Sequence, residues 1–159
     1  MPTRQLYLVR HAKAVSTDID SQKPLSEQGC EDIGKVADFI KPLGLGVDYL
    51  WHSGKLRAEQ TAEVLSEVVE VKIEVAAHSF LAPNDEVAPI KDEIELAEQD
   101  VMIVGHLPFM GKLASLLLAG DEYAGVAAFR AGGIMCLESD DRGKWLLDWM
   151  VIPQIVPSD

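Results

Sequence analysis

Long apolar runs, cysteines and positive charges are all scarce in this chain of 159 residues. No stretch approaches the roughly 18 consecutive apolar residues that a membrane helix needs, so we expect no membrane association. The first residues lead at once into a strand pattern, where no signal peptide fits. Two cysteines, Cys30 and Cys136, stand apart among apolar neighbours without the spacing of metal ligands. We therefore expect reduced core cysteines in a cytoplasmic protein.

The shortage of positive charge excludes one large class of partner. The chain has 14 lysines and arginines against 26 aspartates and glutamates, a formal net charge of -12. Binding to nucleic acid needs many cationic contacts to phosphates, so we expect no nucleic-acid partner. If such a chain handles phosphate, its cations must be concentrated in one small site.

What the chain does have is a regular alternation of apolar patterns. Strand patterns at residues 6–11, 48–53, 71–75 and 101–106 are each followed by a helical pattern. Ser26 is the expected N-cap of the first helix, and the third helix begins at Glu86 or Pro89. Residues 133–139 and 144–151 read as a hairpin at the sheet edge, with one face formed by Trp145, Leu147, Trp149 and Val151.

This order of elements predicts the fold. We expect one domain over residues 1–159: an α/β three-layer sandwich with a mostly parallel central sheet, helices on both faces and a C-terminal edge hairpin. Only about two dozen residues separate the third and fourth strands, too few for an inserted helical lid. In such sheets, ligands bind at the carboxyl ends of the strands.

Polar side chains stand at that edge on three of the expected strands. Arg10 and His11 end the first, Ser53 and Arg57 follow the second, and His106 ends the fourth. A pair such as Arg10 and His11 alone would suit an ordinary surface turn, but the set is much more specific. Arg57 falls in the first turn of a helix, where a cation is disfavoured unless an anion is bound as well.

This set of residues suits phosphoryl transfer through a covalent histidine. A neutral imidazole can attack phosphorus if its other nitrogen donates a proton to a fixed acceptor, and we assign this role to His11. Two guanidinium groups, Arg10 and Arg57, with a cationic His106, can hold the phosphoryl oxygens without any metal or cofactor.

Three segments resemble the signatures of the histidine phosphatase superfamily: residues 8–14 (LVRHAKA), 56–61 (LRAEQT) and 104–108 (VGHLP). With the chain length, the combination is most similar to the SixA-type phosphohistidine phosphatases, and residues 24–29 (PLSEQG) extend the match. The resemblance implies a metal-independent phosphatase whose catalytic residues are Arg10, His11, Arg57 and His106, with His11 phosphorylated in turnover.

The sequence departs from the superfamily pattern at two places. Ala12 stands where the superfamily usually has glycine, which adds a methyl where the backbone approaches phosphate. Phe80 stands where many superfamily enzymes carry an acidic proton donor, with Asp85 and Glu86 nearby as substitutes. Phosphohistidine needs such an acid least, because imidazole, with a pKa of about 6.5, leaves far more easily than an alkoxide.

Three functions follow from these observations. The first is a phosphatase for the phosphohistidine of a signalling protein, and the second is a phosphatase for small phosphate monoesters that uses Asp85 or Glu86 as the acid. The third is a phosphoprotein-binding module without turnover. Ser53 and Lys13 are further candidates for binding substrate, although a helix cap and a solvated lysine explain them equally well. We expect only structural roles for His52 and His78, and the sequence leaves the oligomeric state open.

Overall fold

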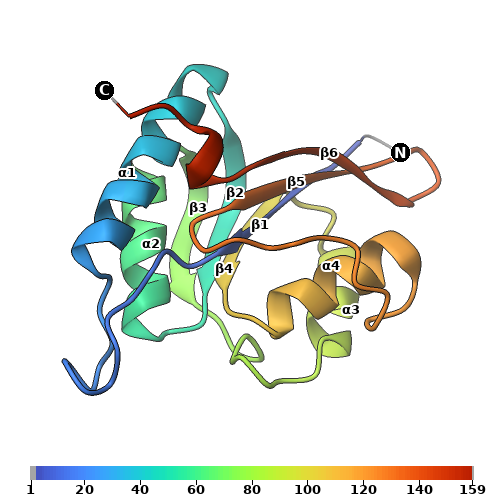
Figure 1. Ribbon diagram of the computed structural model, residues 1–159. Coiled ribbons are helices and arrows are strands. Elements are labelled where there is room, and N and C mark those ends of the chain that lie inside the picture. The colour runs from blue at the N-terminus through green and yellow to red at the C-terminus, as the bar shows by residue number, and fades with distance from the viewer. Residues whose placement is uncertain (1–2, 159) are drawn as a thin grey trace.

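The computed structural model describes residues 3–158, in which strands and helices alternate as far as α4 (Figure 1). Two short 3-10 helices, η1 (Lys41–Leu43) and η2 (Pro153–Ile155), follow α1 and β6. The ten main elements are, in order, β1 (Gln5–Arg10), α1 (Glu27–Ile40), β2 (Gly46–His52), α2 (Leu56–Ser66), β3 (Glu70–Ala77), α3 (Ala88–Ala97), β4 (Val101–Gly105), α4 (Phe109–Ala119), β5 (Ile134–Ser139) and β6 (Trp145–Val151).

The six strands form one sheet in the order β3-β2-β4-β1-β5-β6. Strands β1 to β4 are parallel to one another, whereas β5 runs antiparallel to β1 and forms a hairpin with β6. Helices α1 and α2 lie on one face, and α3 and α4 lie on the other (Figure 1). The predicted sandwich with a mostly parallel sheet and a C-terminal edge hairpin is confirmed.

The central strands explain why both faces are covered. In β1, Tyr7 and Val9 pack towards α1 and α2, while Leu6 and Leu8 pack towards α3 and α4. All five residues of β4 are buried, as expected for a parallel strand between two helical layers. The carboxyl ends of β1 and β4 are therefore fixed side by side in the middle of the molecule.

Helix α1 begins as predicted, because the Ser26 hydroxyl accepts a hydrogen bond from the Gly29 amide at 2.9 Å. The expectation that Cys30 is a core residue is wrong: Cys30 is exposed, whereas Cys136 is buried. The first turn of α1 packs through Gly29 against the Lys13 carbonyl, in so close a contact that a Cβ on residue 29 would lie 2.0 Å from that oxygen. Cys30 consequently turns towards solvent.

In the hairpin, the side chains of β6 do not all lie on the predicted face. Trp145 pairs with Ser139 and belongs to the core beneath α4, whereas Trp149 pairs with Cys136 and packs on the opposite side of the sheet. The register between β5 and β6 shifts between Cys136 and Leu137, and such a bulge turns the following side chains to the other face. The predicted single face of Trp145, Leu147, Trp149 and Val151 is therefore wrong.

Candidate active site

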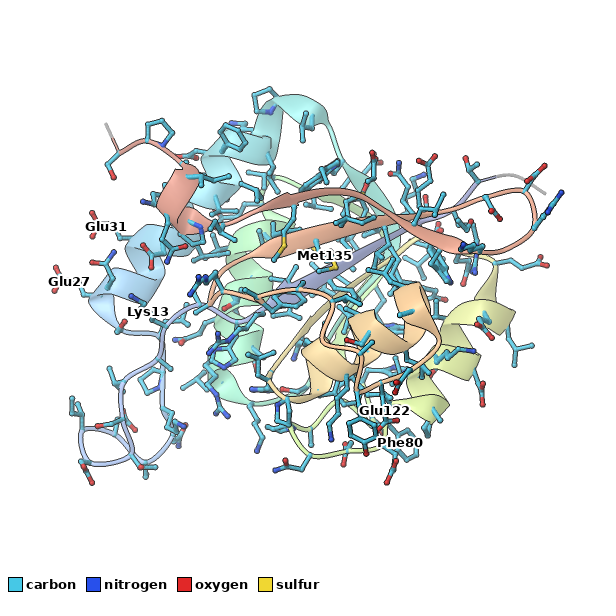
Figure 2. The ribbon with its side chains drawn as sticks, turned by 45° about the vertical axis from the view of Figure 1, so that its right-hand side comes forward. Lys13, Glu27, Glu31, Phe80, Glu122 and Met135 are labelled. Carbon is cyan, nitrogen blue, oxygen red and sulfur yellow. The ribbon has the colours of Figure 1, made fainter. Side chains whose placement is uncertain are left out.

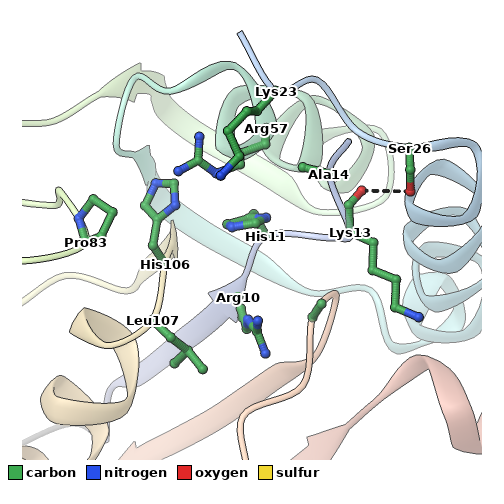
Figure 3. A pocket seen from close by; sticks show the side chains of 11 residues that line it. Arg10, His11, Lys13, Ala14, Lys23, Ser26, Arg57, Pro83, His106 and Leu107 are labelled. Atoms are coloured by element: carbon green, nitrogen blue, oxygen red, sulfur yellow. Dashed lines mark hydrogen bonds between the residues drawn. The ribbon is translucent and has the colours of Figure 1, made fainter. Parts of the chain in front are cut away.

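A cavity of about 580 Å³ opens at the carboxyl ends of the central strands (Figure 3). It is strongly cationic in a chain of net charge -12, since it collects two arginines, two lysines and two histidines and no carboxylate among the described residues. The residues that line it are Arg10, His11, Lys13, Ala14, Lys23, Ser26, Arg57, Pro83, His106, Leu107 and Ala131.

His11 is held in one tautomer by the backbone. Its Nδ1 lies 2.7 Å from the Ala12 carbonyl oxygen, and because a carbonyl can only accept, Nδ1 must carry the proton. The Nε2 lone pair is then available for nucleophilic attack. The backbone amide of His11 also donates to the Gly105 carbonyl at 2.9 Å, which ties the end of β1 to the end of β4.

His106 follows β4 directly and faces His11, with 4.9 Å between the ring centroids. Its Nε2 lies 2.6 Å from the Ser53 hydroxyl oxygen, and its buried Nδ1 has no hydrogen-bond partner in the described part of the chain. Ser53 therefore contacts the second histidine and does not itself line the cavity. The predicted contact of Ser53 with substrate stays a prediction.

Arg10 is clamped by the loop before β5. Its Nη1 donates to the Phe129 carbonyl at 2.9 Å, and its backbone carbonyl accepts from the Gly132 amide at 2.9 Å. Gly132 has φ +77° and lies close to Ala12. Glycine is favoured at this position because it adopts a positive φ without steric cost and has no side chain. The Nε of Arg10 is buried and has no hydrogen-bond partner among residues 3–158, so this donor is free to bind an anion.

Arg57 projects from the first turn of α2, and Figure 3 shows its guanidinium group beside the rings of His11 and His106. One turn later, the fully buried hydroxyl of Thr61 donates to the Arg57 carbonyl at 2.8 Å and accepts from the Ala12 amide at 3.1 Å. Thr61 thereby joins α2 to the segment that carries His11. The sequence places Thr61 on the same side as Arg57 but gives no sign of this contact.

Ala12, the departure from the superfamily pattern, is compatible with this arrangement. Its side chain is fully buried and is absent from the cavity lining. The added methyl packs towards Gly132 and does not reduce the space in front of His11.

Burial keeps both cavity histidines neutral. It lowers the pKa of His11 to about 4, assisted by the nearby Arg57 and Arg10 and partly opposed by the hydrogen bond to Ala12. Burial also lowers the pKa of His106 to about 3, with further contributions from His11 and Arg57. A doubly charged phosphoryl group in the cavity would favour the protonated form of His106.

Two lysines lie at the mouth of the cavity, and they differ in direction. Lys13 lines it, but Figure 3 shows its side chain running away from His11 along α1. Lys23 reaches towards Arg57 from the loop before α1 and contributes to the lowered pKa of both histidines. Sequence reasoning missed Lys23, because a lysine in a loop without periodicity carries no signal.

The carboxylates proposed as an acid lie outside the cavity lining. Asp85 instead accepts a hydrogen bond from the Ala82 amide at 2.9 Å and so holds the turn before α3. Phe80, at the position expected for an acid, is 58% exposed and has φ +68°. Figure 2 shows it projecting outward at the surface of the molecule.

His52 and His78 have the structural surroundings expected of them. His52 accepts a hydrogen bond from the Gly54 amide at 3.1 Å. His78 stacks on Trp51 with 4.0 Å between ring centroids and contacts Glu93 at 2.8 Å. Within residues 3–158, no three acidic, histidine or cysteine side chains come together as metal ligands, and no helix is long and apolar enough to cross a membrane.

Comparison with known proteins agrees with the resemblance seen in the motifs. A model of the histidine phosphatase superfamily (branch 1) matches residues 6–81. The phosphohistidine phosphatase SixA of Escherichia coli is 24% identical over 154 residues, which cover 94% of each chain.

Solved structures establish the same fold. A structure of the protein histidine phosphatase SixA complexed with tungstate has a TM-score of 0.82 and 24% identity, covering 94% of this chain and 97% of that one. A phosphoserine phosphatase from Entamoeba histolytica has a TM-score of 0.70 at 16% identity, covering 95% and 98% of the two chains. At such identities the likeness concerns the fold, which is shared by enzymes named for different substrates.

Proposed function

We propose that this chain, a phosphatase of the histidine phosphatase superfamily, hydrolyses phosphohistidine on a partner protein through a phosphorylated His11. The observation that carries the proposal is the hydrogen bond of 2.7 Å from His11 Nδ1 to the Ala12 carbonyl, at the centre of a cationic cavity. It leaves Nε2 unprotonated and available to attack phosphorus. The similarity to SixA, which is named as a phosphohistidine phosphatase, supports this choice of substrate.

In the first step, the His11 Nε2 lone pair forms a bond to phosphorus while the bond from phosphorus to the substrate imidazole breaks. The other nitrogen of the substrate ring carries a proton taken from solvent, so the departing nitrogen keeps the electron pair of the broken bond and the ring leaves as neutral imidazole. Arg10, Arg57 and His106 hold the phosphoryl oxygens, where the transition-state charge develops. His106 takes up a proton when the anion binds, which makes it a third cationic contact.

In the second step, water attacks phosphorus and the bond to His11 Nε2 breaks. The water loses a proton, inorganic phosphate leaves, and His11 returns to the neutral tautomer that its contact with Ala12 favours. The two steps together consume one water for each phosphoryl group and need no other reactant.

The choice of a P–N substrate depends on the leaving group. Expelling an alkoxide from a phosphate ester needs a proton donor close to the ester oxygen. No carboxylate lines the cavity among residues 3–158, and Asp85 is bound to the Ala82 amide. Imidazole leaves without such help, so this cavity suits phosphohistidine better than an alkyl phosphate.

Parallel hydrolysis assays test the proposal. The enzyme is incubated with a phosphohistidine-containing carrier protein and, separately, with a panel of sugar and nucleotide monophosphates, and phosphate release is measured. We expect hydrolysis of the protein substrate well above that of every ester. Faster ester hydrolysis would favour the small-molecule phosphatase, and absence of both activities would favour a binding module.

A further inference from the structure

Strand β3 leaves one long edge of the sheet open. It has eight residues, Glu70–Ala77, and ends the strand order on that side. Within residues 3–158 it pairs only with β2. Ile73 and Val75 are 55% and 42% exposed. An exposed edge strand with apolar side chains and no proline is a template for pairing with another strand.

The backbone hydrogen bonds determine which residues of β3 face outward. The amides of Glu70 and His78, eight positions apart, both donate towards β2, to the Leu45 and His52 carbonyls at 2.9 and 2.8 Å. In a parallel strand, the residues that bond to one neighbour alternate with those that bond to the other. The amides and carbonyls of Val71, Ile73 and Val75 therefore face the open edge.

The side chains of β3 are complementary to themselves. If two copies pair antiparallel about Ile73, Lys72 of each copy lies opposite Glu74 of the other, and this pairing occurs twice. On the other face, Val71 lies opposite Val75 and the two Ile73 side chains meet. Opposite charges and β-branched pairs in these positions stabilise a sheet.

Neighbouring registers lack this complementarity. Pairing centred on Lys72 places the two lysines opposite each other and Glu70 opposite Glu74, and pairing centred on Glu74 places two glutamates together. Like charges directly opposite destabilise a sheet. Charge thus selects the register centred on Ile73, in which the outward backbone groups of both strands also meet.

We propose that β3 is a homodimer interface, in which two copies pair antiparallel about Ile73 and form one continuous sheet of two six-stranded halves. The two halves run in opposite directions, so the carboxyl ends of their parallel strands, with the cavities around His11, lie at opposite ends of the dimer. Each cavity stays open to its own partner protein. The interface is independent of the proposed function, because none of its residues lines that cavity.

Sedimentation velocity of the full chain tests the interface, from about 10 µM to about 1 mM because small interfaces are weak. It is carried out at about 0.15 M salt, which screens the repulsion between two acidic copies to a range of about 8 Å. We expect the mass to rise from that of one chain, 17.4 kDa, towards twice that value. A wild-type chain that stays monomeric over this range would overturn the proposal.

Charge variants test the register. Lys72→Glu and Glu74→Lys should each weaken dimerisation about tenfold, because each creates two like-charged pairs. The double variant K72E/E74K should restore it, since the opposite charges face each other again. Lys144→Glu, the same charge change beside the opposite edge strand, is the control and should leave dimerisation unchanged.

The comparison of dimerisation between the variants and the wild type requires that every variant is folded. Circular dichroism and thermal melting at low concentration should match the wild type, because residues 72 and 74 are exposed. A dimer that Lys72→Glu does not weaken, or that the double variant does not restore, would place the contact elsewhere on the molecule and overturn the proposal.

Discussion

At the scale of single residues, Thr61 connects the two segments that build the cavity. Its hydroxyl satisfies the buried Ala12 amide, next to His11, and also donates to the backbone of α2. Thr61→Val keeps the shape of the side chain but leaves that amide without a partner, which should destabilise the fold by about 1–3 kcal/mol. Urea denaturation measures the loss.

Thr61→Ser is the matched control for this prediction. It retains the hydroxyl and removes only a methyl, so it should lose distinctly less stability than Thr61→Val. Equal losses in the two variants would mean that packing of the methyl, and not the hydrogen bond to Ala12, is what Thr61 contributes.

His11 is the residue on which the proposed chemistry depends. His11→Ala should abolish turnover and remove any acid-labile phosphoenzyme, because no other nucleophile replaces its Nε2. Asp85→Asn and Glu86→Gln should leave hydrolysis of phosphohistidine nearly unchanged, since neither side chain lines the cavity. Acid-quench detection of labelled enzyme and steady-state rates measure both effects. A carboxamide variant as inactive as His11→Ala would refute the account of the leaving group.

The candidate residues differ in how far the sequence reveals them. Arg10, His11, Arg57 and His106 can be found from sequence because each stands at the end of a strand or in the first turn of a helix. The contact of Ser53 with His106 joins residues 53 positions apart, and that of Thr61 with Ala12 joins residues 49 apart. Such contacts depend on how α2 packs against the sheet, which local patterns do not encode.

At the scale of elements, the crossing between α1 and the loop after β1 depends on a single glycine. A Cβ on Gly29 would lie 2.0 Å from the Lys13 carbonyl oxygen. Gly29→Ala should therefore push α1 away from this loop and cost about 3 kcal/mol or more of stability. Chemical denaturation of the purified variant measures it.

Gly34 supplies the control within the same helix. A Cβ there meets nothing within 4 Å, so Gly34→Ala should stabilise the protein by roughly 0.5–1 kcal/mol, the gain from replacing glycine in a helix interior. A similar loss in both alanine variants would show that the close contact at Lys13 relaxes at little cost.

The helices and strands are largely predictable from the periodicity of apolar residues and from helix-capping residues, and the exceptions have physical causes. Ser26 signals the start of α1 because its side chain satisfies a free helix amide. The two faces of β6 cannot be read from the sequence, because the bulge opposite Cys136 and Leu137 interrupts the alternation. A bulge depends on how two strands pair, so the sequence of either strand alone does not predict it.

At the scale of the whole molecule, the buried histidines make stability depend on pH. The pKa of His106 falls from its ordinary 6.5 to about 3 on folding, so between these values the unfolded chain binds more protons than the native one. Stability is fully present above pH 6.5 and is lost as the pH falls towards 3, by at most about 1.4 kcal/mol per pH unit for this group.

His106→Gln removes this titration while it keeps a neutral side chain of similar size. Between pH 7 and pH 4.5, the Tm of this variant should fall less than that of the wild type, as measured by calorimetry in matched buffers. Parallel Tm curves for the two proteins would contradict a lowered pKa at His106. Both curves also contain the titration of carboxylates, which cancels in the comparison.

The strand order also has a consequence for how the chain is made. The central strand β1 is synthesised first, but its parallel neighbour β4 follows much later: Gln5 bonds to Asp100, 95 residues away, and β5 comes later still. At about 5–20 residues per second, β1 waits roughly 5–20 s on the ribosome before either neighbour exists. During that time, four apolar residues that the native fold buries, Leu6 to Val9, are exposed. The first strand is therefore the part of the chain that stays open longest to aggregation during translation.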